Sequence, residues 1–184
     1  LDSLKLHEVF STVFIPKYAV GAGNMPNSPD GINHRISPLK FRAFIGMTGA
    51  MSIGINLLNS PQKEIDEIKK YIEQYKEIRE IIRDAYVYRL SSAFESSCTV
   101  WEYLSRDRCH ALVFVFSHGM NFRETPPLMK LRGLSEEFRY KVSGEEHKIL
   151  NWKCEPLPDR ITFGDGLINY GIQIEPMGDF DCRI

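Results

Sequence analysis

A glycine cluster near the N-terminus is the stretch of this chain best suited to bring backbone close to a small molecule. A short apolar run leads into it, and a loop rich in Pro, Asn, Ser and Gly continues from it to Gly31. Because glycine lacks a Cβ, such a cluster lets the backbone approach a partner closely, and that partner is either a ligand or another loop. A dinucleotide site is disfavoured because no strand–GxGxxG–helix unit follows. The candidate binding residues are Gly21, Ala22, Gly23 and Asn24.

Histidine and cysteine do not occur here in metal-binding patterns. The four cysteines contain no CxxC pair, and the histidines show no ligand spacing. We therefore expect no metal and no cofactor. Scattered cysteines favour a reducing compartment, so a cytoplasmic location is expected. The residues concerned are Cys98, Cys109, Cys154, Cys182, His7, His110, His118 and His147.

Four further side chains have both a structural and a functional interpretation. Asp165 stands between two glycines, which is more typical of a turn carboxylate than of a catalytic acid. Trp101 and Trp152 could stack on a sugar ring, although core packing is the commoner use of tryptophan. His34 lies in a polar loop, where it is either a pocket residue or a loop residue with its own hydrogen bond.

The composition is that of a globular chain with no feature that favours nucleic acid or a membrane. Its 184 residues, 43% of them hydrophobic, suffice for one large or two small domains. A net charge of -1 gives no attraction to nucleic acid or to an anionic membrane, and no apolar run is long enough to span a bilayer. The sequence shows neither an initiator Met nor a signal peptide and begins at Leu1 as if inside an element. We interpret it as a fragment of a longer protein.

One long amphipathic helix organises the first half of the chain. It is expected over residues 61–83 with Ser60 as its N-cap, and a shorter helix should open at Ser37-Pro38 by the same capping logic. Together with strands expected at 12–15 and 51–57, the order strand, helix, strand, helix is the parallel β/α pattern. The long helix has one apolar stripe and a charged opposite side. The stripe consists of Ile65, Ile68, Ile72, Tyr75, Ile78 and Ile82.

The hydrophobic period changes directly after Asp84, from helical spacing to strand-like runs. Several short strands at close spacing, without further helices, favour an antiparallel sandwich. We therefore expect two domains, residues 1–84 and 85–184. The strands are expected near 85–90, 98–104, 111–116, 128–132, 138–142, 160–163, 167–174 and 179–183.

Five short motifs follow one another along nearly the whole chain. They are Ser37-Pro38-Leu39 with Arg42; residues 75–79 followed by 88–92; residues 105–113; residues 131–134 with 140–142; and residues 164–171. Each motif is weak alone, but in this order they resemble the α-galactosidases of glycoside hydrolase family 36.

The resemblance implies both a fold and an activity. Residues 1–84 would be the last two β/α units of a (β/α)8 barrel, and residues 85–184 a C-terminal antiparallel β-sandwich domain. The parent protein would hydrolyse terminal α-galactosyl residues of oligosaccharides with retention and without a cofactor. Retention uses two carboxyl groups roughly 5 Å apart. The family carries them in K-W-D and S-D-x-T-D segments that this sequence does not contain. No catalytic residue is therefore expected in this chain.

The resemblance also implies a pocket wall at the glycine cluster. The family's M-G-A-H strand end corresponds to residues 20–23, where Gly23 replaces the histidine, and its P-N-H stretch is similar to the one at His34. Its G-Y-E-L-D-L strand corresponds to residues 52–57, where both acidic residues are missing. The sugar specificity of the parent could therefore have shifted to α-N-acetylgalactosaminides or another α-glycoside.

A second class of function stays open beside the enzyme. The chain could be a non-catalytic structural or carbohydrate-binding β-sandwich module. In either case the C-terminal domain could cover apolar barrel surface and contribute contacts to a homo-oligomer.

Overall fold

The protein is described by a computed structural model in two compact units, Leu1–Asp84 (unit 1) and Ala85–Ile184 (unit 2). The strand expected at 12–15 and the glycine cluster at Gly21–Gly23 lie outside the described residues. The structure describes residues 4–5, 8–9, 24–31, 34–119, 128–144, 147–149, 152–154, 160–174 and 177–184.

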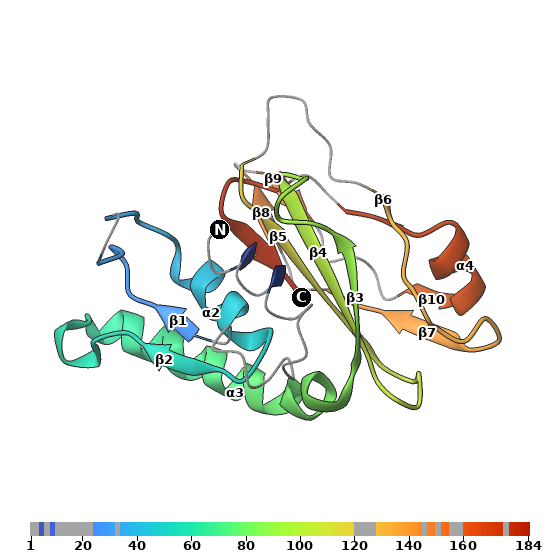
Figure 1. The fold of residues 1–184 in the computed structure, drawn as a ribbon, viewed down its shortest axis with the longest axis horizontal. Helices are drawn as coiled ribbons and strands as arrows, with labels where there is room; N and C mark the ends of the chain where they lie inside the picture. The colour runs from blue at the N-terminus through green and yellow to red at the C-terminus, as the bar shows by residue number, and fades with distance from the viewer. Residues whose placement is uncertain are drawn as a thin grey trace. The chain divides into compact units, whose positions relative to one another are not determined.

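From Asn24 onward, the described part of unit 1 contains short parallel strands and helices (Figure 1). In chain order they are β1 (Asn24–Pro26), α2 (Leu39–Met47), β2 (Ser52–Gly54), the 3₁₀ helix η2 (Leu57–Asn59) and α3 (Gln62–Asp84). β1 and β2 pair in parallel along their whole length. Parallel neighbours need a crossover connection, and α2 lies within it. The parallel β/α order expected from the sequence is confirmed, but β1 lies in the stretch up to Gly31 that was expected to be a loop.

The long helix α3 is amphipathic as predicted. Ile68 and Ile82 of its apolar stripe are buried and the rest of the stripe is half-buried, whereas the charged side is exposed. Because the stripe repeats every three to four residues, all of it faces the same way. Met25 of β1, Ala43 of α2 and Ile68 form one buried apolar cluster that joins the three elements.

Both predicted serine caps are wrong. The carbonyl of Pro61 accepts the first N–H bonds of α3, while the Ser60 hydroxyl donates to the carbonyl of Asn56 (3.2 Å). Pro38 is the N-cap of α2, and no side chain caps that helix, so Ser37 does not act as its cap either. In each Ser-Pro pair, the proline is the last residue before the helix. The residue that precedes the helix is therefore one position later than expected.

Strand β2 is shorter than the strand expected at 51–57. Strand pairing ends at Gly54, and the side-chain oxygen of Asn56 accepts the N–H of Leu58 at 3.2 Å at the start of η2. Asparagine often competes with regular backbone pairing in this way. Alternating apolar residues on both sides of Asn56 therefore do not extend the strand.

The main sheet of unit 2 has four antiparallel strands. It consists of β3 (Tyr86–Ser91), β4 (Cys98–Leu104), β5 (Ala111–Ser117) and β12 (Asp181–Arg183), in the spatial order β12-β5-β4-β3. β4 is buried along its whole length, which fits its nearly continuous run of β-branched, aromatic and apolar residues. The antiparallel sandwich character expected for the second half is confirmed.

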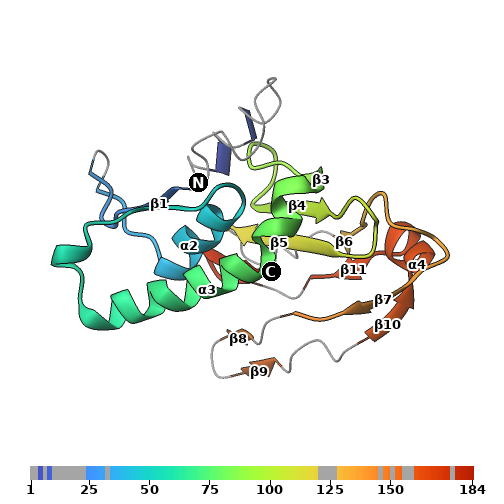
Figure 2. The same ribbon diagram turned by 90° about the horizontal axis from the view of Figure 1, so that it is seen from below.

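Three two-stranded sheets complete unit 2 (Figure 2). The core of unit 2 lies between one face of the main sheet, α4 and the segments of β6, β7 and β11. The buried core residues are Cys98, Val100, Leu104, Val115, Met129, Leu131, Leu134, Tyr140, Leu167, Ile174 and Met177. The sheets pair β6 (Leu128–Met129) with β11 (Ile172–Gln173), β7 (Arg139–Val142) with β10 (Arg160–Phe163), and β8 (His147–Ile149) with β9 (Trp152–Cys154), all antiparallel.

Two expectations for unit 2 are wrong. The strand expected at 167–174 is a short helix, α4 (Gly164–Asn169), followed by β11, so unit 2 does contain a helix. The helix begins where the Gly164 N–H donates to the carbonyl of Phe138 at 2.9 Å. It ends at Gly171, whose positive φ of 78° only glycine adopts readily. The β8–β9 hairpin was not expected at all, and β6 is shorter than the strand expected at 128–132.

Candidate functional site at the ends of the parallel strands

The carboxyl ends of β1 and β2 bring two asparagines together. Asn27 follows β1 directly, and Asn56 lies two residues after β2. The backbone N–H of Asn56 donates to the side-chain oxygen of Asn27 at 3.1 Å, across 29 positions of sequence. Both residues are exposed. In parallel β/α architectures, ligands bind at this end of the strands.

These amide side chains can bind but cannot transfer protons. An asparagine amide offers two donors and one acceptor oxygen, and it does not titrate. Sugar hydroxyls are suitable partners for such groups, whereas acid–base catalysis needs a titratable side chain. The site formed by these described residues is therefore suited to holding a polyhydroxyl ligand and not to cleaving one.

The loop that leaves β1 folds back on itself. The N–H of Asp30 donates to the Arg35 carbonyl, and the N–H of His34 donates to the Asp30 carbonyl, each at 3.0 Å. The N–H of Ser37 donates to the Ser28 hydroxyl at 3.0 Å. These bonds tie the described residues of the loop to one another next to the strand ends.

Of the predicted pocket residues, His34 and Asn24 lie within the described part of the chain. His34 is exposed on this loop at a positive φ of 56°, a conformation that histidine tolerates better than most residues. Asn24 begins β1, and its backbone pairs with Ser52. A pocket role for either residue stays a prediction.

Arg42 was missed as a site residue by the sequence reasoning. It lies on α2 and is only 5% exposed, yet it reaches the last residue of β1, donating from Nη1 to the Pro26 carbonyl at 2.8 Å. Its Nε donates to the Ser37 carbonyl at 3.2 Å, and its Nη2 pairs with Glu64 at 3.0 Å. The available signal was an arginine among the apolar residues of a short helix, since an interior arginine needs partners.

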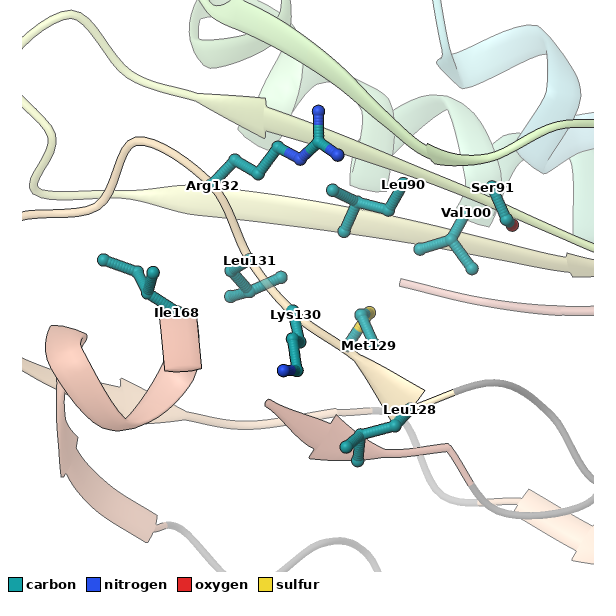
Figure 3. Close-up of a pocket in the computed structure, with 9 residues that line it drawn as sticks. All are labelled: Leu90, Ser91, Val100, Leu128, Met129, Lys130, Leu131, Arg132 and Ile168. Carbon is teal, nitrogen blue, oxygen red and sulfur yellow. The ribbon is translucent and has the colours of Figure 1, made fainter. Parts of the chain in front are cut away.

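A separate cavity of about 390 Å³ lies in unit 2, between β3, β4, the β6 segment and α4 (Figure 3). It contains none of the predicted site residues. Its wall is mostly apolar, and its Ser91 hydroxyl is already bound to the Cys98 carbonyl at 2.6 Å. The lining residues are Leu90, Ser91, Val100, Leu128, Met129, Lys130, Leu131, Arg132 and Ile168.

Glu102 is a buried carboxyl group inside unit 2. Its side chain lies on β4 with no solvent exposure, and one oxygen accepts the Arg132 backbone N–H at 2.7 Å. Burial raises the pKa of Glu102 to about 7. Because no solvent reaches it, this carboxyl cannot meet a substrate and is a structural group.

The remaining candidates have structural roles where the structure describes them. Trp101 is 1% exposed and packs edge-on against Phe116, so the core interpretation is correct and sugar stacking by Trp101 is excluded. The side chain of Trp152 lies outside the described residues. Asp165 is exposed and accepts a hydrogen bond from the Asn169 amide in the first turn of α4.

The described ranges contain no helix that is both long and apolar enough to cross a bilayer. No cluster of three or more His, Cys, Asp or Glu side chains suited to a metal ion occurs in them either.

Two family models match consecutive parts of the chain. Residues 2–85 match the melibiase model, and residues 98–184 match the model of the glycosyl hydrolase family 36 C-terminal domain. The chain belongs to glycoside hydrolase family 36. The resemblance drawn from the five motifs is thereby confirmed.

Curated relatives within this family are α-galactosidases by name. Alpha-galactosidase 2 of Hypocrea jecorina is 27% identical over 177 residues, which cover 95% of this chain and 21% of the relative. Alpha-galactosidase Mel36A of Lactobacillus acidophilus is 26% identical over 186 residues, covering 100% of this chain and 23% of the relative. The chain therefore spans about a fifth of the length of these relatives.

Solved structures of the family share the fold. The galactosidase domain of the α-galactosidase–sucrose kinase AgaSK matches with a TM-score of 0.79 at 22% identity, over 99% of this chain and 24% of that one. The family 36 α-galactosidase AgaB from Geobacillus stearothermophilus matches with a TM-score of 0.77 at 23% identity, over 99% of this chain and 24% of that one. Unit 1 is the end of the family's (β/α)8 barrel, and unit 2 is its C-terminal β-domain.

Family membership relates the carboxyl ends of β1 and β2 to the barrel face at which active sites lie. Active sites of such barrels lie at the carboxyl ends of the strands, which is where Asn27 and Asn56 meet. By the sequence correspondence, Gly54 and Asn56 stand where the family has its two acidic residues. Neither replacement carries a charge.

Proposed function

We propose that the complete protein containing this chain is a retaining glycoside hydrolase that cleaves terminal α-galactosyl residues from oligosaccharides. The observation that carries this proposal is the match of two family 36 models, in order, over residues 2–85 and 98–184. The names of the curated relatives support an α-galactoside as substrate. Because this chain spans about a fifth of those relatives, the activity is proposed for the complete protein.

Within that protein, unit 1 contributes part of the sugar-binding wall. Asn27 and Asn56 present neutral hydrogen-bonding groups at the strand ends, and His34 lies exposed on the adjoining loop. The two catalytic carboxyl groups are proposed to come from outside this chain, and the mechanism needs no cofactor. Unit 2, which is built on the four-stranded sheet around the buried strand β4, has a structural role.

One observation favours a second substrate. The family's acidic pair in the β2 region is replaced by Gly54 and Asn56. Glycine removes side-chain volume and asparagine removes charge, and both changes suit a sugar whose 2-hydroxyl is exchanged for a larger, neutral acetamido group. An α-N-acetylgalactosaminide is therefore the alternative substrate.

Parallel assays of the complete protein on three chromogenic glycosides distinguish these possibilities. We expect turnover of p-nitrophenyl α-galactoside, weaker or no turnover of the α-N-acetylgalactosaminide, and none of the β-galactoside control. Proton NMR during the first turnovers should show the α-anomer of galactose, as retention requires. A preference for the acetamido sugar would select the alternative substrate, and a first product in the β form would contradict the mechanism.

The same experiment tests a non-catalytic function. If none of the three glycosides is hydrolysed but galactose still binds in calorimetry, the carbohydrate-binding module becomes the better description. A cytoplasmic location and a homo-oligomeric state remain proposals. The location is supported by the scattered spacing of the four cysteines and by the free thiol of Cys109.

A further inference from the structure

The Arg42 guanidinium bonds both ends of the loop that leaves β1. Nη1 donates to the carbonyl of Pro26, the last residue of β1, and Nε donates to the carbonyl of Ser37, directly before α2 begins to form. The loop between these two carbonyls comprises residues 27–36 and carries Asn27 and His34. One side chain thus fixes the start and the end of the loop.

Glu64 of α3 orients this guanidinium. Its Oε1 accepts from Nη2 at 3.0 Å, and the side chains of Arg42 and Glu64 are 6% and 27% exposed. The guanidinium fork is planar, so three partners on three segments hold it in one orientation. A buried charge of this kind is costly to leave unpaired, which makes Arg42 and Glu64 depend on each other.

The hydrogen bonds from Arg42 to the carbonyls of Pro26 and Ser37 form a clasp on the loop. This clasp acts on the carboxyl ends of β1 and β2 through Asn27. Asn27 follows Pro26 directly, and its side-chain oxygen accepts the Asn56 N–H from the end of β2. A shift of the Pro26 carbonyl would therefore move Asn27 relative to Asn56. The hydrogen bond from Ser37 to the Ser28 hydroxyl lies inside the same closure, so Arg42 and this bond restrain the same loop.

We propose that Arg42 is a positioning residue for sugar binding: it holds both ends of loop 27–36 and so places Asn27 beside Asn56 at the carboxyl ends of β1 and β2. This inference rests on the proposed function, because it assigns the loop to the sugar site. Arg42 itself is buried and touches no substrate.

Amide hydrogen exchange on the complete protein tests the clasp without reference to activity. In Arg42→Gln, peptides covering residues 27–37 should exchange at least about ten-fold faster, since two charge-assisted bonds to the loop ends are lost. Peptides from unit 2 should be unchanged. Arg79→Gln is the matched control, because Arg79 is an exposed arginine of unit 1 that forms a 3.7 Å ion pair with neighbouring Glu80. Equal exchange of residues 27–37 in Arg42→Gln and wild type would overturn the proposal.

Kinetics on p-nitrophenyl α-galactoside test the link to binding. We expect Arg42→Gln to raise KM about ten-fold while kcat stays within about three-fold, with Arg42→Lys between Arg42→Gln and wild type. A merely structural loss would lower kcat with the folded fraction and leave KM unchanged, and that result would contradict a positioning role. If Arg42→Gln does not fold, Glu64→Gln replaces it. It keeps an acceptor without the charge and should accelerate exchange in the same segment only. Wild-type protein that hydrolyses no glycoside would refute the proposed function, while the exchange experiment would still decide the clasp.

Discussion

A single buried carboxyl group makes unit 2 sensitive to pH. Glu102 lies on β4 between Tyr88 of β3 and Val113 of β5, and its alternate neighbours on the strand belong to the apolar core. One oxygen accepts the Arg132 N–H, and the other has no hydrogen-bond partner. Because the charged form is poorly solvated there, the pKa of Glu102 rises to about 7. The folded chain therefore prefers the protonated side chain.

We predict that the free energy of unfolding of unit 2 falls as the pH rises from about 4.5 to about 7. The pKa of Glu102 is about 7 when folded, against 4.5 for an unperturbed glutamate, so the folded state binds the proton more tightly. Stability is then full below about pH 4.5 and decreases by roughly 3 kcal/mol up to about pH 7. Glu102→Gln should remove this slope. Urea denaturation followed by tryptophan fluorescence, at several pH values, measures it, because both tryptophans lie in unit 2.

Glu95→Gln is the matched control for this titration. Glu95 is an exposed glutamate of the same unit, so its substitution should leave the pH dependence of wild type intact. If the free energy of unfolding changes with pH equally in wild type and Glu102→Gln, the buried carboxyl group does not set the pH dependence of stability.

At the scale of elements, close backbone contacts decide where α4 forms. Its first residue, Gly164, donates its N–H to Phe138, and an added Cβ would lie 1.9 Å from the Ser135 carbonyl oxygen. That approach brings α4 against the segment between β6 and β7. Residues 167–174 are rich in apolar and β-forming residues, which is why a strand was expected. The helix depends on a tertiary contact that local propensity does not contain.

Gly164→Ala should destabilise unit 2 by about 2–4 kcal/mol, because backbone rather than a flexible side chain blocks the added methyl group. Urea denaturation monitored by tryptophan fluorescence gives the change. Gly178→Ala is the control, since an added Cβ at Gly178 meets nothing within 4 Å. Equal stabilities for the two variants would mean that α4 does not approach Ser135 as described.

The long regular elements were predictable from the sequence, and their ends were not. The stripe from Ile65 to Ile82 and the buried run of β4 contain enough residues to establish a period. Caps depend on which of several partners a hydroxyl reaches, and Ser60 bonds to Asn56 instead of capping α3. The β8–β9 hairpin has three residues per strand, too few to establish a period.

At the scale of the whole molecule, the hydrophobic pattern predicts where the chain divides into two units. The same pattern does not predict the candidate site. The change of period after Asp84 coincides with the division between the two compact units. The contact between Asn27 and Asn56 arises from parallel strand pairing across 29 positions, which no local spacing encodes. Arg42 stands out as a basic residue among the apolar residues of α2. Its hydrogen bonds to the carbonyls of Pro26 and Ser37 could not be deduced from the sequence.

The most direct test compares the complete protein with this 184-residue chain alone on p-nitrophenyl α-galactoside. We predict turnover by the complete protein and none by the chain, because the chain carries part of the sugar-binding wall but no catalytic pair of carboxyl groups. Turnover by the chain alone that is removed by Asp30→Asn or Asp165→Asn would contradict the proposal that the catalytic carboxyl groups come from outside this chain. Inactivity of the complete protein on every α-glycoside offered would contradict the proposed activity itself.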